Sequence, residues 1–184
     1  MYSKLKTSFA FAKNLFVTGA ISETSRKAEI EICKYVPKGE NKIIIELGMG
    51  HGNITREILR NISPSSKLYA FEVNKRFCDH VKKNIFDDRL IIVNDGAENI
   101  KNYVNENVDS VVGSIPFSFI SNEKGNEIIQ VVHDKLVNNA YYSQVLYTKF
   151  NFKKFQKIFF DQCKMKTIKN IPTEFIYHSR KVPE

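Results

Sequence analysis

The sequence predicts an α/β protein with a seven-stranded, mostly parallel sheet, an antiparallel last strand and helices on both faces. Residues 42–47 include three consecutive isoleucines, and such an apolar run is typical of a strand buried on both faces of a parallel sheet. A second apolar run, residues 67–72, follows a helical pattern and completes a β-α-β unit. Strand and helix patterns then alternate without a repeat or linker, so residues 1–184 are expected to form a single domain.

Two helices are expected before the first strand. In residues 2–16, apolar side chains recur at helical spacing among three lysines, which is typical of an amphipathic helix at a membrane surface. The alternative is that this helix packs on the core or forms a lid over a ligand site, within residues 1–21. A second helix is expected from Ser22 or Thr24, as the capping residue, to about Val36.

The first strand leads into three glycines at alternate positions, Gly48, Gly50 and Gly52, and then into a helical pattern that includes residues 54–59. Glycines let the backbone turn tightly and bring its N–H groups close to a ligand at the helix N-terminus. Taken alone, such a segment is also compatible with a simple turn. The strand ends in an acid, Glu46, which would repel a pyrophosphate but can hold a cationic amine.

A second acid supports a ligand site at this position. Glu72 ends the second strand, 20 residues after Gly52, and an acid at about this spacing in a β-α-β unit binds the hydroxyl groups of a ribose. A ligand with both an ammonium group and a ribose would pair with Glu46 through the first and with Glu72 through the second. S-adenosylmethionine, which carries an ammonium and a sulfonium group, is therefore the predicted cofactor.

The remaining elements follow in order along the chain. We expect helices over residues 74–84, 122–136 and 152–160, strands over residues 90–93, 108–113 and 140–148, and an antiparallel pair formed by residues 164–171 and 175–180. Ligands of open α/β sheets bind beyond the carboxyl ends of the parallel strands. The segment 114–119, which follows the fourth strand, is therefore where a second substrate would meet the cofactor.

Composition limits the class of protein. With 184 residues and 42% hydrophobic side chains the chain is typical of one soluble domain, and it contains neither an apolar run long enough to span a bilayer nor a signal-peptide pattern. Its three cysteines are widely separated and lack the spacing of metal ligands. A cytoplasmic protein with reduced thiols and no metal is therefore expected.

The net charge of +8 is concentrated in the two ends of the chain. Basic residues outnumber acidic ones by seven to four in residues 1–40 and by nine to three in residues 149–184, whereas residues 41–148 carry twelve basic and thirteen acidic residues. A basic surface of this kind suits a polyanion, either a nucleic acid or an anionic membrane. The alternative is a solvated, lysine-rich surface without such a partner.

The glycine-rich segment and the second acid resemble the cofactor motifs of class I S-adenosylmethionine-dependent methyltransferases, which have a Rossmann-like fold. The resemblance implies that the loop after the third strand lies along the adenine of the cofactor. There Asp95 would accept a hydrogen bond from the adenine amine, or the backbone of Gly96 and Ala97 would bind it instead. The implied cofactor-binding residues are Glu46, Gly48, Gly50, Gly52, Asn53, Glu72, Val73, Asp95, Gly96, Ala97 and Ser114.

The segment Ser114-Ile115-Pro116-Phe117 resembles the Asn-Ile/Leu/Pro-Pro-Phe/Tyr motif of amino-group methyltransferases, including the ribosomal RNA adenine dimethylases. In those enzymes the Asn oxygen and a backbone carbonyl bind the target amine, and the aromatic ring stacks on its base. Here a serine replaces the asparagine, and the chain ends at Glu184, where the RNA dimethylases carry a helical domain. An rRNA adenine N6-methyltransferase or a small-amine N-methyltransferase, with RNA as the partner in the first case, is thus the second hypothesis.

A fuller resemblance is to the soluble bacterial phospholipid N-methyltransferases, which methylate phosphatidylethanolamine. It covers nearly the whole chain and includes residues 11–26, residues 113–116, Gln144, Tyr147 and residues 170–181. In that family an amphipathic N-terminal helix binds anionic membrane, a role that falls to residues 2–16 here. The resemblance implies a cytoplasmic enzyme, peripherally associated with the inner face of the membrane, that methylates the amine of an aminophospholipid headgroup.

The implied reaction is an in-line attack of the amine nitrogen on the sulfonium methyl group, after the amine has lost a proton. Tyr147 or His178 would relay this proton, Phe119 and other aromatics would stabilise the methylated cation, and Arg180 with Lys181 would bind the lipid phosphate. Core packing or surface solvation is the alternative for each of these side chains. The implied catalytic residues are Ser114, Ile115, Pro116, Phe117 and Tyr147. A third hypothesis is a membrane- or RNA-binding module without turnover.

Overall fold

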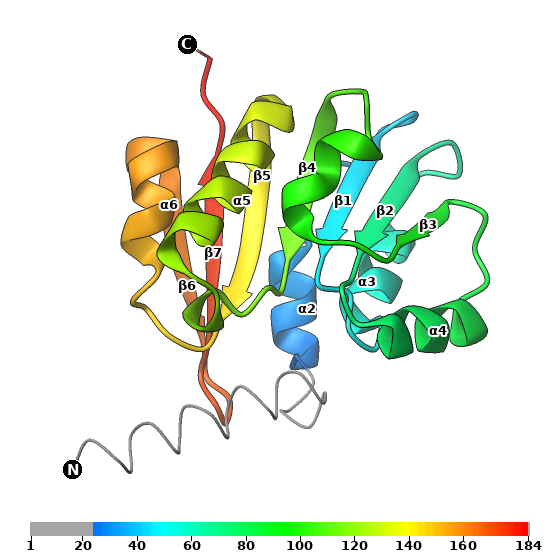
Figure 1. The fold of residues 1–184 in the computed structure, drawn as a ribbon, viewed down its shortest axis with the longest axis horizontal. Helices are drawn as coiled ribbons and strands as arrows, with labels where there is room; N and C mark the ends of the chain where they lie inside the picture. The colour runs from blue at the N-terminus through cyan, green and yellow to red at the C-terminus, as the bar shows by residue number, and fades with distance from the viewer. Residues whose placement is uncertain (1–23, 184) are drawn as a thin grey trace.

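The computed structural model of the chain describes residues 24–183, so the helix predicted over residues 2–16 and the lid within residues 1–21 lie outside it. Within the described residues, one sheet has the strand order β3-β2-β1-β4-β5-β7-β6 (Figure 1). Its strands are β1 (Ile43–Leu47), β2 (Lys67–Phe71), β3 (Leu90–Val93), β4 (Val108–Gly113), β5 (Leu136–Leu146), β6 (Cys163–Ile168) and β7 (Glu174–Arg180). The predicted seven-stranded α/β fold is confirmed.

The strand directions place a crevice in the middle of the sheet. Strands β1 to β5 are parallel, and β7 runs antiparallel to both of its neighbours, β5 and β6. The chain leaves β1 outward through β2 and β3 and then returns to β4 on the other side of β1. Ligands bind at such a switch point, beyond the carboxyl ends of the strands. Here the loops after β1 and β4 meet.

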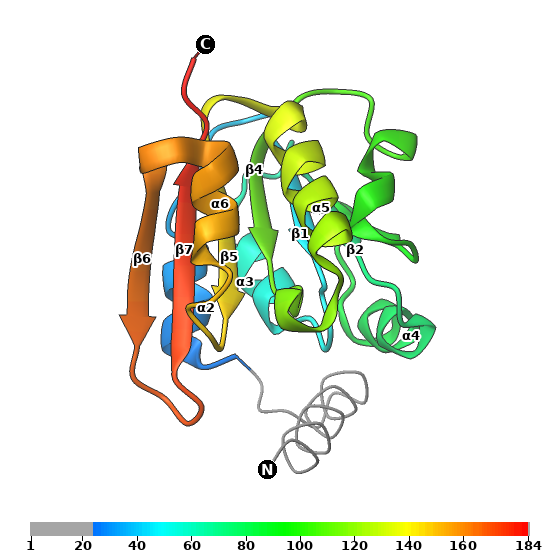
Figure 2. The same cartoon turned by 60° about the vertical axis from the view of Figure 1, so that its left-hand side comes forward.

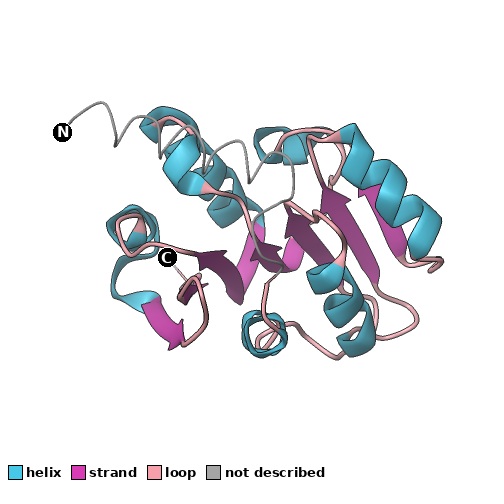
Figure 3. Ribbon diagram, turned by 90° about the horizontal axis from the view of Figure 1, so that it is seen from below, coloured by secondary structure: helices cyan, strands magenta, loops and turns pink. Residues whose placement is uncertain are grey.

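Helices cover both faces of the sheet (Figures 1 and 3). One face carries α2 (Arg26–Ile32), α3 (Asn53–Asn61) and α4 (Lys75–Asn84), and the other carries α5 (Asn122–Lys135), α6 (Phe152–Phe159) and the 3-10 helix η1 (Ala97–Asn102). Because successive strand residues point to opposite faces, Ile44 of β1 packs under α2 and α3 while Ile45 packs under α5 and α6. The consecutive isoleucines of β1 therefore contribute side chains to two hydrophobic cores, one on each face of the sheet.

Strand β5 departs most from the predicted boundaries. It begins at Leu136, directly after α5, and not near Ala140. Leu136 pairs with Val108 whereas Tyr141 pairs with Ser110, so the residues between them bulge out of register. Within this bulge Asn139 has a φ angle of 69°, a left-handed conformation that asparagine adopts more readily than most residues.

No helix within residues 24–183 combines the length and the apolar character needed to cross a bilayer. Cys33, Cys78 and Cys163 are all buried, free thiols.

Candidate active site

The loop after β1 turns through three glycines with positive φ angles, 78° at Gly48, 51° at Gly50 and 84° at Gly52. Residues with a Cβ atom rarely adopt this conformation. A Cβ atom on Gly52 would also lie 2.8 Å from Cδ1 of Ile85, whereas one on Gly50 would have no neighbour within 4 Å. Gly50 thus borders open space at the switch point. Helix α3 begins immediately behind, at Asn53, and Gly52 gives it no side-chain cap.

Glu46 lies beneath this loop and is only 1% exposed. Its Oε2 accepts a hydrogen bond of 2.6 Å from the Thr55 hydroxyl, while Oε1 has no partner among residues 24–183. Burial, with a smaller contribution from the negative charge of Glu72, raises the pKa of Glu46 to about 8. A buried carboxylate with an unsatisfied oxygen suits an ammonium group, which supplies both a donor and the opposite charge.

Glu72 is held at the mouth of the same loop by the backbone. Its Oε2 accepts from the Gly50 N–H at 3.2 Å and its Oε1 from the Asn74 N–H at 2.8 Å. Burial raises the pKa of Glu72. A further backbone contact comes from Val73, and a carboxylate with about four lone-pair positions still keeps one that a ribose hydroxyl can use. Val73 beside it is 74% exposed, and its contact with the cofactor stays a prediction.

Asp95 is already engaged within its own loop. Its Oδ1 accepts hydrogen bonds from the Gly96 N–H at 2.7 Å and from Asn99 Nδ2 at 2.9 Å, and its Oδ2 accepts one from the Tyr103 hydroxyl at 2.9 Å. These bonds, that from Asn99 first, lower the pKa of Asp95. The Gly96 N–H is therefore not free for a ligand. Contact of Asp95 or Ala97 with adenine stays a prediction.

The segment after β4 is tied to the glycine-rich loop. The Ser114 hydroxyl donates a hydrogen bond of 2.5 Å to the Gly48 carbonyl oxygen, and the Ser114 N–H donates one of 2.8 Å to the Leu47 carbonyl oxygen. The predicted acceptor residues Ser114, Ile115 and Pro116 are thus brought against the predicted cofactor loop.

Gln144 of β5 positions this segment, a role that the sequence pattern did not indicate. Its Nε2 donates to the Ile115 carbonyl at 3.0 Å and to the Val145 carbonyl at 2.9 Å, and its Oε1 accepts from the Tyr142 hydroxyl at 2.7 Å. The side chain is fully buried, and a Cβ atom on Gly113 would overlap its Oε1. The available signal was a single amide in the buried half of the strand.

Phe117 belongs to the core and not to an acceptor pocket, which corrects its prediction as a catalytic residue. The short 3-10 helix η2 (Phe117–Phe119) turns its ring inward, where it is fully buried. The ring centroid lies 5.4 Å from that of Phe155 in α6, and the ring edge also faces Gly125 of α5.

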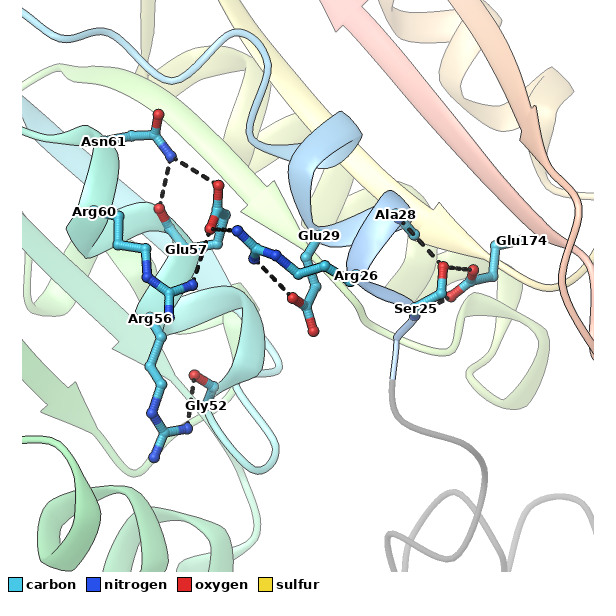
Figure 4. Close-up of polar contacts among 10 residues, drawn as sticks. All are labelled: Ser25, Arg26, Ala28, Glu29, Gly52, Arg56, Glu57, Arg60, Asn61 and Glu174. Atoms are coloured by element: carbon cyan, nitrogen blue, oxygen red, sulfur yellow. Dashed lines mark hydrogen bonds and ion pairs between the residues drawn. The ribbon is translucent and has the colours of Figure 1, made fainter.

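The N-terminus of α2 is fixed at the carboxyl edge of the sheet (Figure 4). Ser25, and not the predicted Ser22 or Thr24, caps this helix by accepting a hydrogen bond of 3.3 Å from the Ala28 N–H. Ser25 also donates to buried Glu174 at the start of β7, from its N–H at 2.9 Å and from its hydroxyl at 2.5 Å. On the other side, Arg26 pairs with Glu57 of α3 at 2.6 Å. Helix α2 therefore bridges α3 and β7.

Tyr147 follows β5 at the same edge and is half-buried. It is hydrogen-bonded to the side chain of Thr24, which precedes α2, and lies near Glu174. Burial, and then the charge of Glu174, raises the pKa of Tyr147. The phenol therefore stays protonated at neutral pH. It can relay a proton, but it is not a phenolate that could act as a general base.

His178, Arg180 and Lys181 lie away from the crevice, so their predicted roles there are wrong. Because β7 is antiparallel, it begins at the carboxyl ends of the parallel strands and finishes near their amino ends. There Arg180 and Lys181 bind Asn139 Oδ1 at 2.6 Å and the Leu136 carbonyl at 2.9 Å, respectively. His178 lies buried under α2, with Nδ1 2.8 Å from the Ser143 hydroxyl, and burial lowers its pKa.

Comparison with known proteins gives relatives of low identity. No protein-family model matches the chain. It is 23% identical over 155 residues to an ornithine lipid N-methyltransferase of Singulisphaera acidiphila, which covers 81% of both chains. It is 31% identical over 89 residues to ribosomal RNA small subunit methyltransferase A of Mycoplasmopsis synoviae, covering 45% of this chain and 31% of that protein.

Solved structures share the fold at low identity. A precorrin-6y C5,15-methyltransferase of Geobacter metallireducens superposes with a TM-score of 0.73 at 14% identity, covering 86% of this chain and 90% of that one. The N-methyltransferase NodS of Bradyrhizobium japonicum, in complex with S-adenosyl-L-homocysteine, gives 0.68 at 10% identity, covering 86% and 87%.

The fold is that of the class I methyltransferases. The comparisons support S-adenosylmethionine as the cofactor and methyl transfer as the activity, and the Glu46, Gly50 and Glu72 geometry fits that cofactor.

Proposed function

We propose that this chain transfers methyl groups from S-adenosylmethionine to the amine of a membrane-lipid headgroup. The single observation that carries the proposal is the burial of Phe117 in the core. Without that ring, the motif lacks the aromatic residue expected to stack on a nucleobase, so an aliphatic amine fits the site better than an adenine. The near full-length similarity to an ornithine lipid N-methyltransferase supports the same substrate class.

The cofactor, when bound, supplies an electrophilic methyl group on a sulfonium. Glu46 would hold its ammonium group with the free Oε1, and Glu72 would hold its ribose hydroxyls, close to the exposed side chain of Val73. The N-terminus of α3, which has no side-chain cap, would face its carboxylate.

Ser114 would receive the amine. Its hydrogen is committed to the Gly48 carbonyl, so its oxygen can only accept a hydrogen bond from a substrate. In this arrangement the serine supplies the same acceptor that the family motif obtains from an asparagine oxygen. The Ile115 carbonyl already accepts hydrogen bonds from Gln144 Nε2 at 3.0 Å and from the Phe117 N–H at 2.9 Å, so both of its lone pairs are used and the amine would rely on the Ser114 oxygen.

The amine must be neutral to attack, so its proton has to leave the site. The neutral phenol of Tyr147 would accept this proton from the amine as it releases its own hydroxyl proton to solvent, so that the net change is the loss of one proton from the amine. Exclusion of water and correct orientation would provide most of the remaining rate enhancement.

A ribosomal RNA acceptor is the second candidate, because the chain also matches ribosomal RNA methyltransferase A at 31% identity over 89 residues. To separate the two, the protein is incubated with methyl-labelled S-adenosylmethionine and either aminolipid vesicles containing anionic lipid or total RNA. We expect label in the lipid fraction, and much less of it at subsaturating cofactor when Glu72→Ala is used. Label in RNA alone would overturn the lipid proposal.

A further inference from the structure

Two loops at the carboxyl edge of the sheet expose large apolar side chains. Phe150, between β5 and α6, is 91% exposed, and Ile171, in the hairpin between β6 and β7, is 92% exposed. Strands β5 and β6 run in the same direction, so both loops leave the sheet on the side of the glycine-rich loop. Figures 1 and 2 both show these loops together at the lower edge of the molecule.

Exposed lysines lie beside these two side chains in the sequence, within a basic segment that also reaches the opposite edge of the sheet. Residues 147–173 contain seven lysines and one acid, Asp161, which lies in the 3-10 helix η3 (Phe160–Gln162) at the opposite end of β6. Lys149 adjoins Phe150, and Lys169 precedes Ile171 by two residues; both lysines are exposed. None of the salt bridges found within residues 24–183 involves any of the seven lysines.

The loop that carries Phe150 is anchored to the acceptor segment. Buried Asn151 donates from Nδ2 to the Ser118 hydroxyl at 3.2 Å, and the Thr148 hydroxyl lies 3.4 Å from the same oxygen. The Thr148 carbonyl also accepts a hydrogen bond of 2.7 Å from Tyr177. Because residues on both sides of Phe150 are fixed, its ring is presented outward next to the place where the acceptor would bind.

We infer that Phe150, Ile171, Lys149 and Lys169 form a docking surface for an anionic lipid bilayer. The inference rests on the proposed lipid acceptor, and it is separate from any role of residues 2–16. Apolar side chains between lysines suit the interface of a bilayer, where the former enter the acyl boundary and the latter meet anionic headgroups. A nucleic acid suits the surface less well, because Ile171 has no aromatic face to stack on a base.

The docking surface is tested by measuring how the full chain partitions onto vesicles of phosphatidylethanolamine and phosphatidylglycerol at several salt concentrations. Phe150→Ser with Ile171→Ser should lower the partition constant by about tenfold or more at every salt concentration. Lys149→Ser with Lys169→Ser should lower it by about fivefold for each lysine at low salt, and by less at high salt.

Matched controls come from the opposite edge of the sheet. Phe160, which is 67% exposed at the end of α6, gives Phe160→Ser, and exposed Lys157 and Lys164 give a double variant with the same change of charge. These controls should bind vesicles much as the wild type does, within about twofold. Equal losses in the control and docking-surface variants, or no loss in the latter, would overturn the inference.

A second substrate separates this inference from the proposed function. Methyl transfer is also measured on a short-chain aminophospholipid that remains monomeric. The docking-surface variants should lose turnover on vesicles and keep it on the monomeric lipid. Unchanged vesicle binding and turnover in these variants would overturn the docking surface and leave the function standing. Loss of vesicle binding without turnover on any aminolipid would support the surface and overturn the function.

Discussion

The hydroxyl of Ser114 donates a hydrogen bond of 2.5 Å to the carbonyl oxygen of Gly48. This bond joins the end of β4 to the glycine-rich loop after β1, and it leaves the serine oxygen with only acceptor capacity toward a substrate. The acceptor segment and the cofactor loop are therefore positioned as one unit.

Ser114→Ala should lower kcat by about 10- to 100-fold, because it removes both the acceptor and the link that orients the segment. Its effect on the free energy of unfolding should be small, about 1 kcal/mol. Ser114→Thr keeps a hydroxyl and should recover part of the activity. Steady-state kinetics at saturating cofactor check this; wild-type kcat in the alanine variant would contradict the assigned role.

Glu46 should make the ligand-free protein less stable as the pH rises. Its pKa of about 8 in the folded state lies above the ordinary value of 4.5, so between these values the folded protein binds a proton that the unfolded chain lacks. Stability should then fall by up to about 1.4 kcal/mol per pH unit from about pH 5 to pH 8. Glu46→Gln should flatten this slope, stabilise the protein at pH 8 and weaken cofactor binding.

Denaturant unfolding at several pH values, together with titration calorimetry of the cofactor, measures both effects of Glu46→Gln. Identical pH slopes in the variant and the wild type would show that Glu46 is ionised in the folded protein.

Glu72→Ala should weaken cofactor binding by about tenfold or more, because hydrogen bonds to a charged acceptor are lost together with the anchor of the Gly50 loop. Glu106, an exposed acid in the loop before β4, gives the matched control Glu106→Ala, which should bind like the wild type. Equal affinities of all three proteins in calorimetry would remove Glu72 from the cofactor site.

Gly113→Ala should destabilise the protein by about 2–3 kcal/mol, because the new Cβ atom overlaps Gln144 Oε1 and displaces the amide from Ile115. Gly125→Ala is the control. Its Cβ would lie 3.4 Å from Phe117 Cδ1, and alanine in a helix interior should be neutral or stabilising by about 0.5–1 kcal/mol. Thermal unfolding checks the pair, and equal effects would argue against the Gln144 contact.

The sequence predicted those parts of the fold in which the local spacing of apolar residues indicates burial. Strands β1 and β4 are buried along nearly their whole length because both faces of the sheet are covered, and the short connection from β1 to α3 leaves little choice of topology. The start of β5 was missed because a bulge around Asn139 interrupts the pattern. The 3-10 helices η1 and η2 are too short to give a periodic signal.

The site could be predicted where topology alone brings residues together, as it does for Glu46, Gly50 and Glu72. Predictions failed where contacts between distant elements decide the outcome. Phe117 packs in the core against Phe155 of α6, a contact that a linear motif does not reveal. The position of Arg180 depends on the direction of β7. Because β7 is antiparallel, Arg180 lies near the amino ends of the parallel strands, at the edge opposite the crevice.

The most direct test of the proposed function is mass spectrometry of the lipid headgroup after incubation with S-adenosylmethionine and aminolipid vesicles. The account predicts headgroups heavier by one methylene for each methyl group transferred, located on the nitrogen by fragmentation, and strongly reduced with Glu72→Ala at subsaturating S-adenosylmethionine. Unmodified lipids, when the same preparation methylates RNA or a soluble amine, would contradict the assignment of a lipid amine as the acceptor.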